Sequence, residues 1–180
     1  YKKNINLLNK LPAKIDKLIN EFTPNAKIIS KKLSQANACY FIGRNIAYPI
    51  ALEGSLKLKE ISYMHSEGFP GGEMKHGPIA LIDKDSITIC LIPNNDLFEK
   101  SESNAQEISA RNGKIIILSS VKNMRKINGE IKVMNMPKEN IIDTPFIYTI
   151  PLQLISYYFA LSEGTDIDQP RNLAKSVTVE

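Results

Sequence analysis

The amino-acid sequence predicts an α/β domain, a three-layer αβα sandwich around a mostly parallel sheet of four or five strands. Short apolar and β-branched runs alternate along the chain with longer segments of helical periodicity. Most of these runs are apolar at nearly every position, which is typical of strands buried on both faces of a parallel sheet. A length of 180 residues suits a single domain with a sizeable core.

The strands are predicted from apolar runs that end at glycine or proline. The first run, Ala-Cys-Tyr-Phe-Ile, stops at Gly43, the second stops at Pro93, and the fourth ends at Pro137. The third is Lys-Ile-Ile-Ile-Leu. The four predicted strands cover residues 38–42, 86–92, 114–118 and 131–136. Phe69-Pro70-Gly71-Gly72 is interpreted as a cluster of structure breakers between elements.

The helices are predicted from apolar residues at three- and four-residue spacing. They cover residues 3–34, 51–65, 97–112 and 144–162. Pro12 and Pro24 are expected to divide the first segment, with Thr23 as an N-cap and Pro24 in the first turn of a new helix. Pro49 fits only the first turn of the second helix, and Pro151 is expected to kink the last one.

Composition and charge exclude several classes of protein. Hydrophobic residues make up 43% of the chain and charged residues 23%, which are ordinary values for a soluble globular protein. We find neither a secretory signal nor an apolar stretch long enough to span a membrane, so we expect no membrane association. The net charge of +4 is not clustered. Lys31-Lys32 and residues 122–126 lack interleaved aromatic residues, so we expect no nucleic-acid binding.

The cysteines and histidines do not form a metal-binding pattern. Cys39 and Cys90 lie inside apolar strands, where a free thiol behaves as a small buried hydrophobic group. We therefore expect a reduced, cytoplasmic protein without disulfides. Two histidines and two strand cysteines show no ligand spacing, so we expect no metal site.

Three charged residues are candidates for a site: Glu53, Lys57 and Glu60. A helix over residues 51–65 places them on one face, at i, i+4 and i+7. Most of the remaining circumference is small or apolar, so we expect this helix to be buried. Buried charges are rare unless they are paired. The charged stripe therefore indicates the wall of a site, and a surface helix with ordinary ion pairs is the structural alternative.

Two loops are further candidates. The turn at Gly43-Arg44-Asn45 follows a strand, where ligands bind in open α/β sheets. It lacks the further glycines of a dinucleotide-binding turn and the hydroxyls of a sugar-phosphate loop, so it fits a phosphate site poorly. His76 lies in a loop rich in Gly and Pro and can serve as a proton shuttle. His65, near the end of the helix, is interpreted as structural.

Two separated motifs resemble those of one enzyme family. They are ALEGSLKLKEISYMHSEGFPGGEMKHGPIALID, which starts at Ala51, and DQPRNLAKSVTVE, which starts at Asp168. Both are similar, in this order, to motifs in the C-terminal part of the glutamine–fructose-6-phosphate aminotransferase (glucosamine-6-phosphate synthase) family. The resemblance covers essentially the whole chain, as the second of that family's two sugar isomerase (SIS) domains. It implies an SIS-type fold with five parallel strands flanked by helices.

The resemblance also implies a role for each candidate residue, without a cofactor. Glu60 would move a proton between C1 and C2 of the sugar, as a carboxylate base can. His76 would assist ring opening across a dimer interface. Lys175 would form an imine with the C2 carbonyl of fructose 6-phosphate, as a lysine amine can. The expected lining residues are Glu53 and Lys57, which would tune proton transfer, together with Arg171 and Ala174 of the tail.

The family's other parts are expected to be absent from this chain. They are an N-terminal glutaminase domain with a cysteine nucleophile, and a first SIS domain whose Ser/Thr-rich loop holds the sugar phosphate. Because the chain begins at Tyr1, we expect a fragment of a longer protein. It would be one SIS domain over residues 1–180, with a tail over residues 165–180. The fragment alone would lack a complete pocket and would be inactive.

The parent enzyme would make glucosamine 6-phosphate from fructose 6-phosphate and glutamine, the first step of hexosamine synthesis. Two other functions stay open. One is a related isomerase or deglycase that uses the Glu60 site without glutamine, although an imine-forming lysine in the tail suits amination better. The other is a non-catalytic sugar-phosphate sensor, which has no need for Glu60, His76 and Lys175 together.

Overall fold

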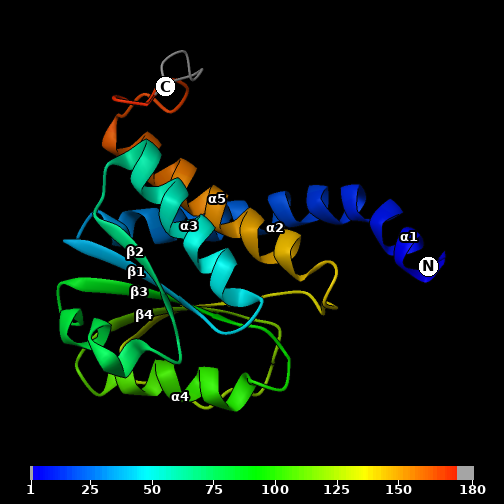
Figure 1. The fold of residues 1–180 in the computed structure, drawn as a ribbon. Coiled ribbons are helices and arrows are strands. Elements are labelled where there is room, and N and C mark those ends of the chain that lie inside the picture. The colour runs from blue at the N-terminus through cyan, green and yellow to red at the C-terminus, as the bar shows by residue number, and fades with distance from the viewer. Residues whose placement is uncertain (1, 174–180) are drawn as a thin grey trace, which may run out of the picture.

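A five-stranded parallel sheet forms the middle layer of the computed structural model, which describes residues 2–173 (Figure 1). The strands are β1 (Ala38–Gly43), β2 (Ser66–Pro70), β3 (Ser86–Ile92), β4 (Lys114–Ser119) and β5 (Glu130–Asn135). They lie in the order β2-β1-β3-β4-β5, and all four neighbouring pairs are parallel. The predicted fold class is confirmed.

Helices cover both faces of the sheet. They are α1 (Lys2–Asn9), α2 (Leu11–Leu33), α3 (Ala47–Ser62), α4 (Phe98–Ser109) and α5 (Thr144–Glu163), with short 3-10 helices η1 (Met74–His76) and η2 (Pro78–Leu81). Helices α2, α3 and α5 lie on one side, and α4 lies on the other (Figure 1). Within residues 2–173, no helix combines the length and the apolar character needed to cross a membrane.

A separate hydrophobic core lies on each face of the sheet. Alternate strand residues point to opposite faces, so Phe41 and Ile89 join the larger core under α2, α3 and α5. Tyr40 and Ile42 join the smaller core with α4 and the η1–η2 segment. Every residue of β1 and β3 is buried, which explains why these strands are mostly apolar.

β2 is a strand that the residue pattern did not predict. Its sequence, Ser-Glu-Gly-Phe-Pro, contains Gly68 and Pro70 and overlaps the segment interpreted as a breaker cluster. β2 lies at the edge of the sheet and pairs only with β1. An edge strand tolerates proline, because its unpaired side needs no N–H donor.

The expected helix boundary at Pro24 was wrong, because α2 continues through this residue. Pro24 has no N–H to donate, which costs about 3 kcal/mol inside a helix. Thr23 does not cap a new helix, since its hydroxyl donates to the Ile19 carbonyl at 2.7 Å. A buried apolar face on both sides of the proline outweighs the local cost. Its members are Leu18, Phe22, Ala26, Ile29 and Leu33.

The two cysteines are buried free thiols, as expected. Cys39 lies on β1 and Cys90 on the neighbouring strand β3. Burial raises the pKa of both thiols, that of Cys90 to about 12. Neither group is therefore a thiolate near neutral pH, which excludes both as nucleophiles in the folded protein.

Candidate active site

The charged stripe on α3 is a compact ion-pair cluster. The Lys57 ammonium donates a hydrogen bond to Glu60 Oε2 at 2.8 Å and lies 3.8 Å from Glu53 Oε1. The exposed fractions of the three side chains lie between 25% and 38%. The predicted i, i+4, i+7 arrangement is therefore present, and water can still reach it.

Lys57 is held in its charged form. The hydrogen bond to Glu60 is the main cause that raises the pKa of Lys57, desolvation opposes it, and the charges of Glu60 and Glu53 add to the increase. A protonated lysine between two carboxylates restricts where the Glu60 oxygens can lie.

The expectation that this helix is buried all round was wrong. Leu52 and Leu56, on the circumference expected to be covered, are 41% and 42% exposed. The helix also spans Ala47–Ser62 rather than residues 51–65. Tyr63 ends it in the left-handed backbone region, with φ of 61°. His65 therefore lies beyond the helix, where its carbonyl accepts a hydrogen bond from Cys39 N at 3.0 Å.

The segment after α5 returns to the end of α3. The Thr165 hydroxyl donates to the Ile61 carbonyl at 2.6 Å. The Arg171 backbone N–H donates to the Tyr63 hydroxyl at 2.9 Å, and the Arg171 guanidinium lies over the Tyr63 ring, 4.1 Å from its centroid. These contacts bring the beginning of the tail motif next to Glu60.

A cavity of about 390 Å³ lies where the tail meets α3. Its lining residues are Leu56, Lys59, Glu60, Tyr63, Arg171, Asn172 and Leu173. Ala174 and Lys175 lie outside the described residues. Leu173, two positions before Lys175, is the last described residue of the cavity wall.

This cavity is not at the edge of the sheet where the sequence placed the crevice. α3 runs antiparallel to the strands, starting after the carboxyl end of β1 and ending just before the amino end of β2 (Figure 1). Glu60 and Tyr63 are at its C-terminal end. The site therefore lies near the amino ends of β1 and β2.

A family model for the SIS domain matches residues 32–163. The chain belongs to the SIS domain family. Among the residues described here, no group of three or more His, Cys, Asp or Glu side chains could hold a metal ion in this SIS domain.

Two sequence relatives of the SIS domain carry the same name. Proteins named glutamine–fructose-6-phosphate aminotransferase (isomerizing) from Haemophilus influenzae and Salmonella typhimurium are 48% and 45% identical to it. The alignments cover 98% and 96% of this chain but only 29% and 28% of the relatives. The SIS domain thus spans less than a third of the length of these proteins.

Solved structures agree with this resemblance. The C-terminal domain of glucosamine-fructose-6-phosphate aminotransferase from Francisella tularensis has a TM-score of 0.88 at 40% identity. The match covers 93% of this chain and 47% of that chain. A structure from Bacillus subtilis, at 20% identity and a TM-score of 0.73 over 91% of this chain and 48% of that chain, shares the fold. The resemblance stated from the two motifs is confirmed.

His76 is not near Glu60 within one copy of the SIS domain. Met74 of η1 packs in the smaller core with α4, whereas α3 packs in the larger core on the other face of the sheet. The sheet therefore separates the two candidate residues. The His76 side chain is exposed, so it is free to approach another molecule.

The residue that sequence reasoning missed is Tyr63. Its position three residues after Glu60 was visible, but nothing local indicated that it contacts a residue 108 positions away.

Gly43, considered for a phosphate turn, has a packing role instead. A Cβ at Gly43 would lie 2.1 Å from the Ala47 carbonyl oxygen, so only glycine fits this tight entry into α3.

Proposed function

We propose that this SIS domain carries the sugar-isomerase half of an enzyme that makes glucosamine 6-phosphate from fructose 6-phosphate and glutamine. The observation that carries the proposal is the cavity in which Glu60 meets the start of the tail motif, with Lys57 bonded to Glu60. The names of the relatives support the same reaction. The remaining domains of such an enzyme would lie outside residues 1–180.

Glu60 acts as the base in this proposal. Isomerisation of a ketose to an aldose moves a proton between two adjacent carbons, and one carboxylate can serve both positions. The 2.8 Å hydrogen bond from Lys57 limits the motion of the carboxylate, and Glu53 lies on the far side of the ammonium. Lys57 and Glu53 therefore position and tune the base.

Lys175 supplies the imine nitrogen in this proposal. A lysine amine attacks a ketone carbonyl to form a Schiff base with loss of water. Arg171, anchored on Tyr63, and Leu173 in the cavity wall support an approach of the tail motif to Glu60. Ala174 would line the same site.

His76 acts on a second copy of the chain in this proposal. Its exposure and its place on the opposite face of the sheet support a site shared between two subunits. The enzyme would therefore be a homodimer at least. Its free buried thiols fit a reducing, cytoplasmic location.

The isolated SIS domain would be inactive. The turn at Gly43-Arg44-Asn45 lacks the hydroxyl groups of a sugar-phosphate loop, and the relatives are more than three times as long as this chain. The residues that bind the phosphate group of the sugar would come from another SIS domain of the same protein.

Replacing Glu60 by Gln in the full-length protein tests the function. Isomerisation of fructose 6-phosphate should fall by about 10²- to 10⁴-fold, with sugar binding largely kept. Glu163→Gln is the matched control, because Glu163 is exposed at the end of α5. Full activity of Glu60→Gln would show that Glu60 is not the base. Sugar binding without turnover by the unaltered protein would favour a sensor instead.

A further inference from the structure

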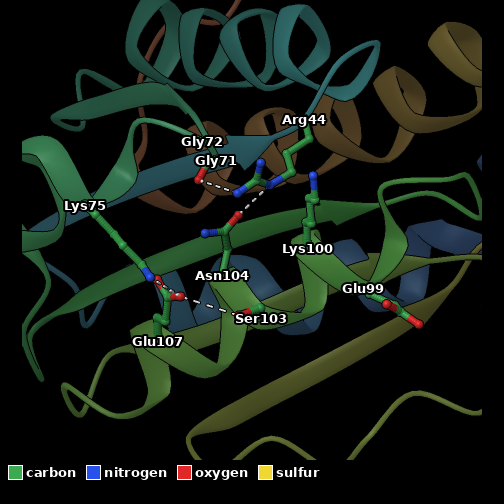
Figure 2. A pocket seen from close by; sticks show the side chains of 9 residues that line it. All are labelled: Arg44, Gly71, Gly72, Lys75, Glu99, Lys100, Ser103, Asn104 and Glu107. Atoms are coloured by element: carbon green, nitrogen blue, oxygen red, sulfur yellow. Dashed lines mark hydrogen bonds and ion pairs between the residues drawn. The ribbon is translucent and has the colours of Figure 1, made fainter.

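The segment that carries His76 is fixed to α4 at two points. It covers residues 71–77, which follow β2 and include η1. Arg44 connects the beginning of this segment to α4, and Glu107 of α4 contacts the residue just before His76 (Figure 2). Neither contact involves a residue that lines the Glu60 cavity.

The first contact fixes the backbone at Gly71. Arg44 Nε donates to the Asn104 side-chain oxygen at 2.8 Å, and Arg44 Nη2 donates to the Gly71 carbonyl at 3.1 Å (Figure 2). The Gly71 N–H donates to the Gly43 carbonyl at 2.8 Å, so both backbone polar groups of Gly71 are bonded. Asn104 is only 4% exposed, so water does not readily replace it as the acceptor. The position of Gly71 therefore depends on Asn104, through Arg44.

The second contact lies directly beside His76. The Lys75 ammonium is 2.9 Å from Glu107 Oε1, and the other carboxylate oxygen of Glu107 is buried (Figure 2). The Lys75 side chain is 65% exposed, and such an ion pair adds little to stability. Its main effect is to restrict where residue 75 lies relative to α4.

The backbone between the two contacts is also held. Met74 is fully buried in the smaller core. The Glu73 N–H donates to the Pro70 carbonyl at 2.9 Å, and the His76 N–H donates to the Glu73 carbonyl at 3.0 Å. The His76 side chain itself is exposed. A fixed backbone thus presents a free imidazole, and a displacement of about 1 Å of such a group can lower a reaction rate about 100-fold.

We propose that Arg44, Asn104 and Glu107 are positioning residues for His76. The inference rests on the proposed function, in which His76 completes the site of a second subunit. Asn104 acts through Arg44, and Glu107 acts through Lys75, so none of the three touches the sugar. Helix α4 of one subunit then sets the position of a side chain that works in the site of the other.

Asn104→Leu in the full-length protein tests the first contact, because leucine has a similar volume but no acceptor. The kcat should fall about 10- to 100-fold, with the KM for fructose 6-phosphate changed less than about threefold. Asn104→Asp keeps an oxygen for Arg44 and should retain activity within about threefold of the unaltered protein. Glu99→Gln, at an exposed position of α4, is the control and should not change kcat.

Mixed dimers with Glu60→Gln separate positioning from a general loss of stability. In the trans arrangement, one subunit carries Glu60→Gln and the other carries Asn104→Leu. The remaining Glu60 then receives His76 from a subunit with Asn104, so about half of the activity should remain. In the cis arrangement, both changes are in one subunit, and activity should be about tenfold lower than in trans. A loss of stability alone would affect both arrangements equally.

His76→Ala in place of Asn104→Leu is the reference. If His76→Ala gives equal activity in cis and trans, the shared site is wrong and this inference falls with it. If His76→Ala gives the difference and Asn104→Leu does not, the positioning role of Asn104 is wrong while the proposed function stands.

The exposed ion pair gives a second test that does not depend on a buried residue. Glu107→Lys places two like charges together and should lower kcat about tenfold. Adding Lys75→Glu restores opposite charges with reversed signs and should return kcat to within about threefold of the unaltered protein. Absence of recovery in the double variant would overturn the role of Glu107.

Discussion

The guanidinium of Arg171 lies over the Tyr63 ring at 4.1 Å, while its backbone N–H donates to the hydroxyl of the same tyrosine at 2.9 Å. One side chain therefore holds both the charge and the backbone at the start of the tail motif. Because Glu60 and Tyr63 line one cavity, the end of α3 sets the positions of the proposed base and of the tail together.

Removing the Tyr63 ring should release the tail. In Tyr63→Ala, both contacts with Arg171 are lost, and hydrogen exchange of the Arg171 amide should accelerate about tenfold. Tyr63→Phe keeps the ring but removes the hydroxyl that accepts from the Arg171 amide, so it should accelerate this exchange as well. Tyr157→Ala, at an exposed tyrosine of α5, is the control. Unchanged exchange in Tyr63→Ala would contradict the anchoring role.

The ion pair of Lys57 with Glu60 should contribute little to stability. Both side chains are partly exposed, so a double-mutant cycle of Lys57→Met and Glu60→Gln by urea unfolding should give a coupling of about 0.5 kcal/mol. The pKa of Lys57 is raised on folding, so the stabilisation is present near neutral pH and is lost as the pH rises through the raised pKa of this lysine. Lys59→Met, at the exposed lysine two positions away, is the control. A coupling of several kcal/mol would contradict this prediction.

The buried thiols should make the protein sensitive to alkali. Folding raises the pKa of Cys90 from 9.0 to about 12, so the folded state holds its proton more tightly than the unfolded state. The contribution of this thiol to the free energy of unfolding should then be constant below pH 9 and fall above it, by about 1 kcal/mol per pH unit. Cys90→Ala should fall less steeply. Rapid reaction of a native thiol with a thiol reagent at pH 8 would contradict the assigned burial.

Borohydride reduction should identify the imine-forming lysine. With fructose 6-phosphate and the full-length protein, reduction should attach the sugar to Lys175, and mass spectrometry of the peptides can locate it. Lys59 also lines the Glu60 cavity and is therefore the informative comparison. Label on Lys59 rather than on Lys175 would show that the imine assignment is wrong.

Mixed dimers should reveal whether His76 acts on a second subunit. Glu60→Gln and His76→Ala should each be nearly inactive alone in the full-length protein. When both are combined in one dimer, one of the two shared sites is intact, so about half of the activity per mixed dimer should return. No recovery in mixed dimers would contradict a site that His76 of one subunit completes for Glu60 of the other.

Local patterns predicted much of this structure. β1, β3 and β4 followed from apolar runs, because buried parallel strands need no polar alternation. The Glu53–Lys57–Glu60 cluster followed from helical spacing alone. β2 did not follow, since its Gly68 and Pro70 are acceptable only at a sheet edge, a property set by the whole topology.

Long-range geometry accounts for the remaining differences. The contact of Arg171 with Tyr63 depends on where α5 delivers the chain, and no local pattern encodes this. The separation of His76 from Glu60 likewise depends on which face of the sheet each segment covers. The continuation of α2 through Pro24 depends on the buried face that crosses the proline. In each case, the outcome depends on tertiary packing, which the residues near each position do not determine.

At Tyr63, the residue that would give the higher stability differs from the residue that anchors the tail. The Tyr63 φ of 61° lies in the left-handed region of the backbone. Glycine adopts this region at a conformational free energy lower by roughly 1 kcal/mol. A search for heat-resistant variants would therefore favour glycine at this position. The same substitution would remove the ring that holds Arg171, so the gain in stability would come with a loose tail. A more robust version of this domain should keep the tyrosine and obtain its stability elsewhere.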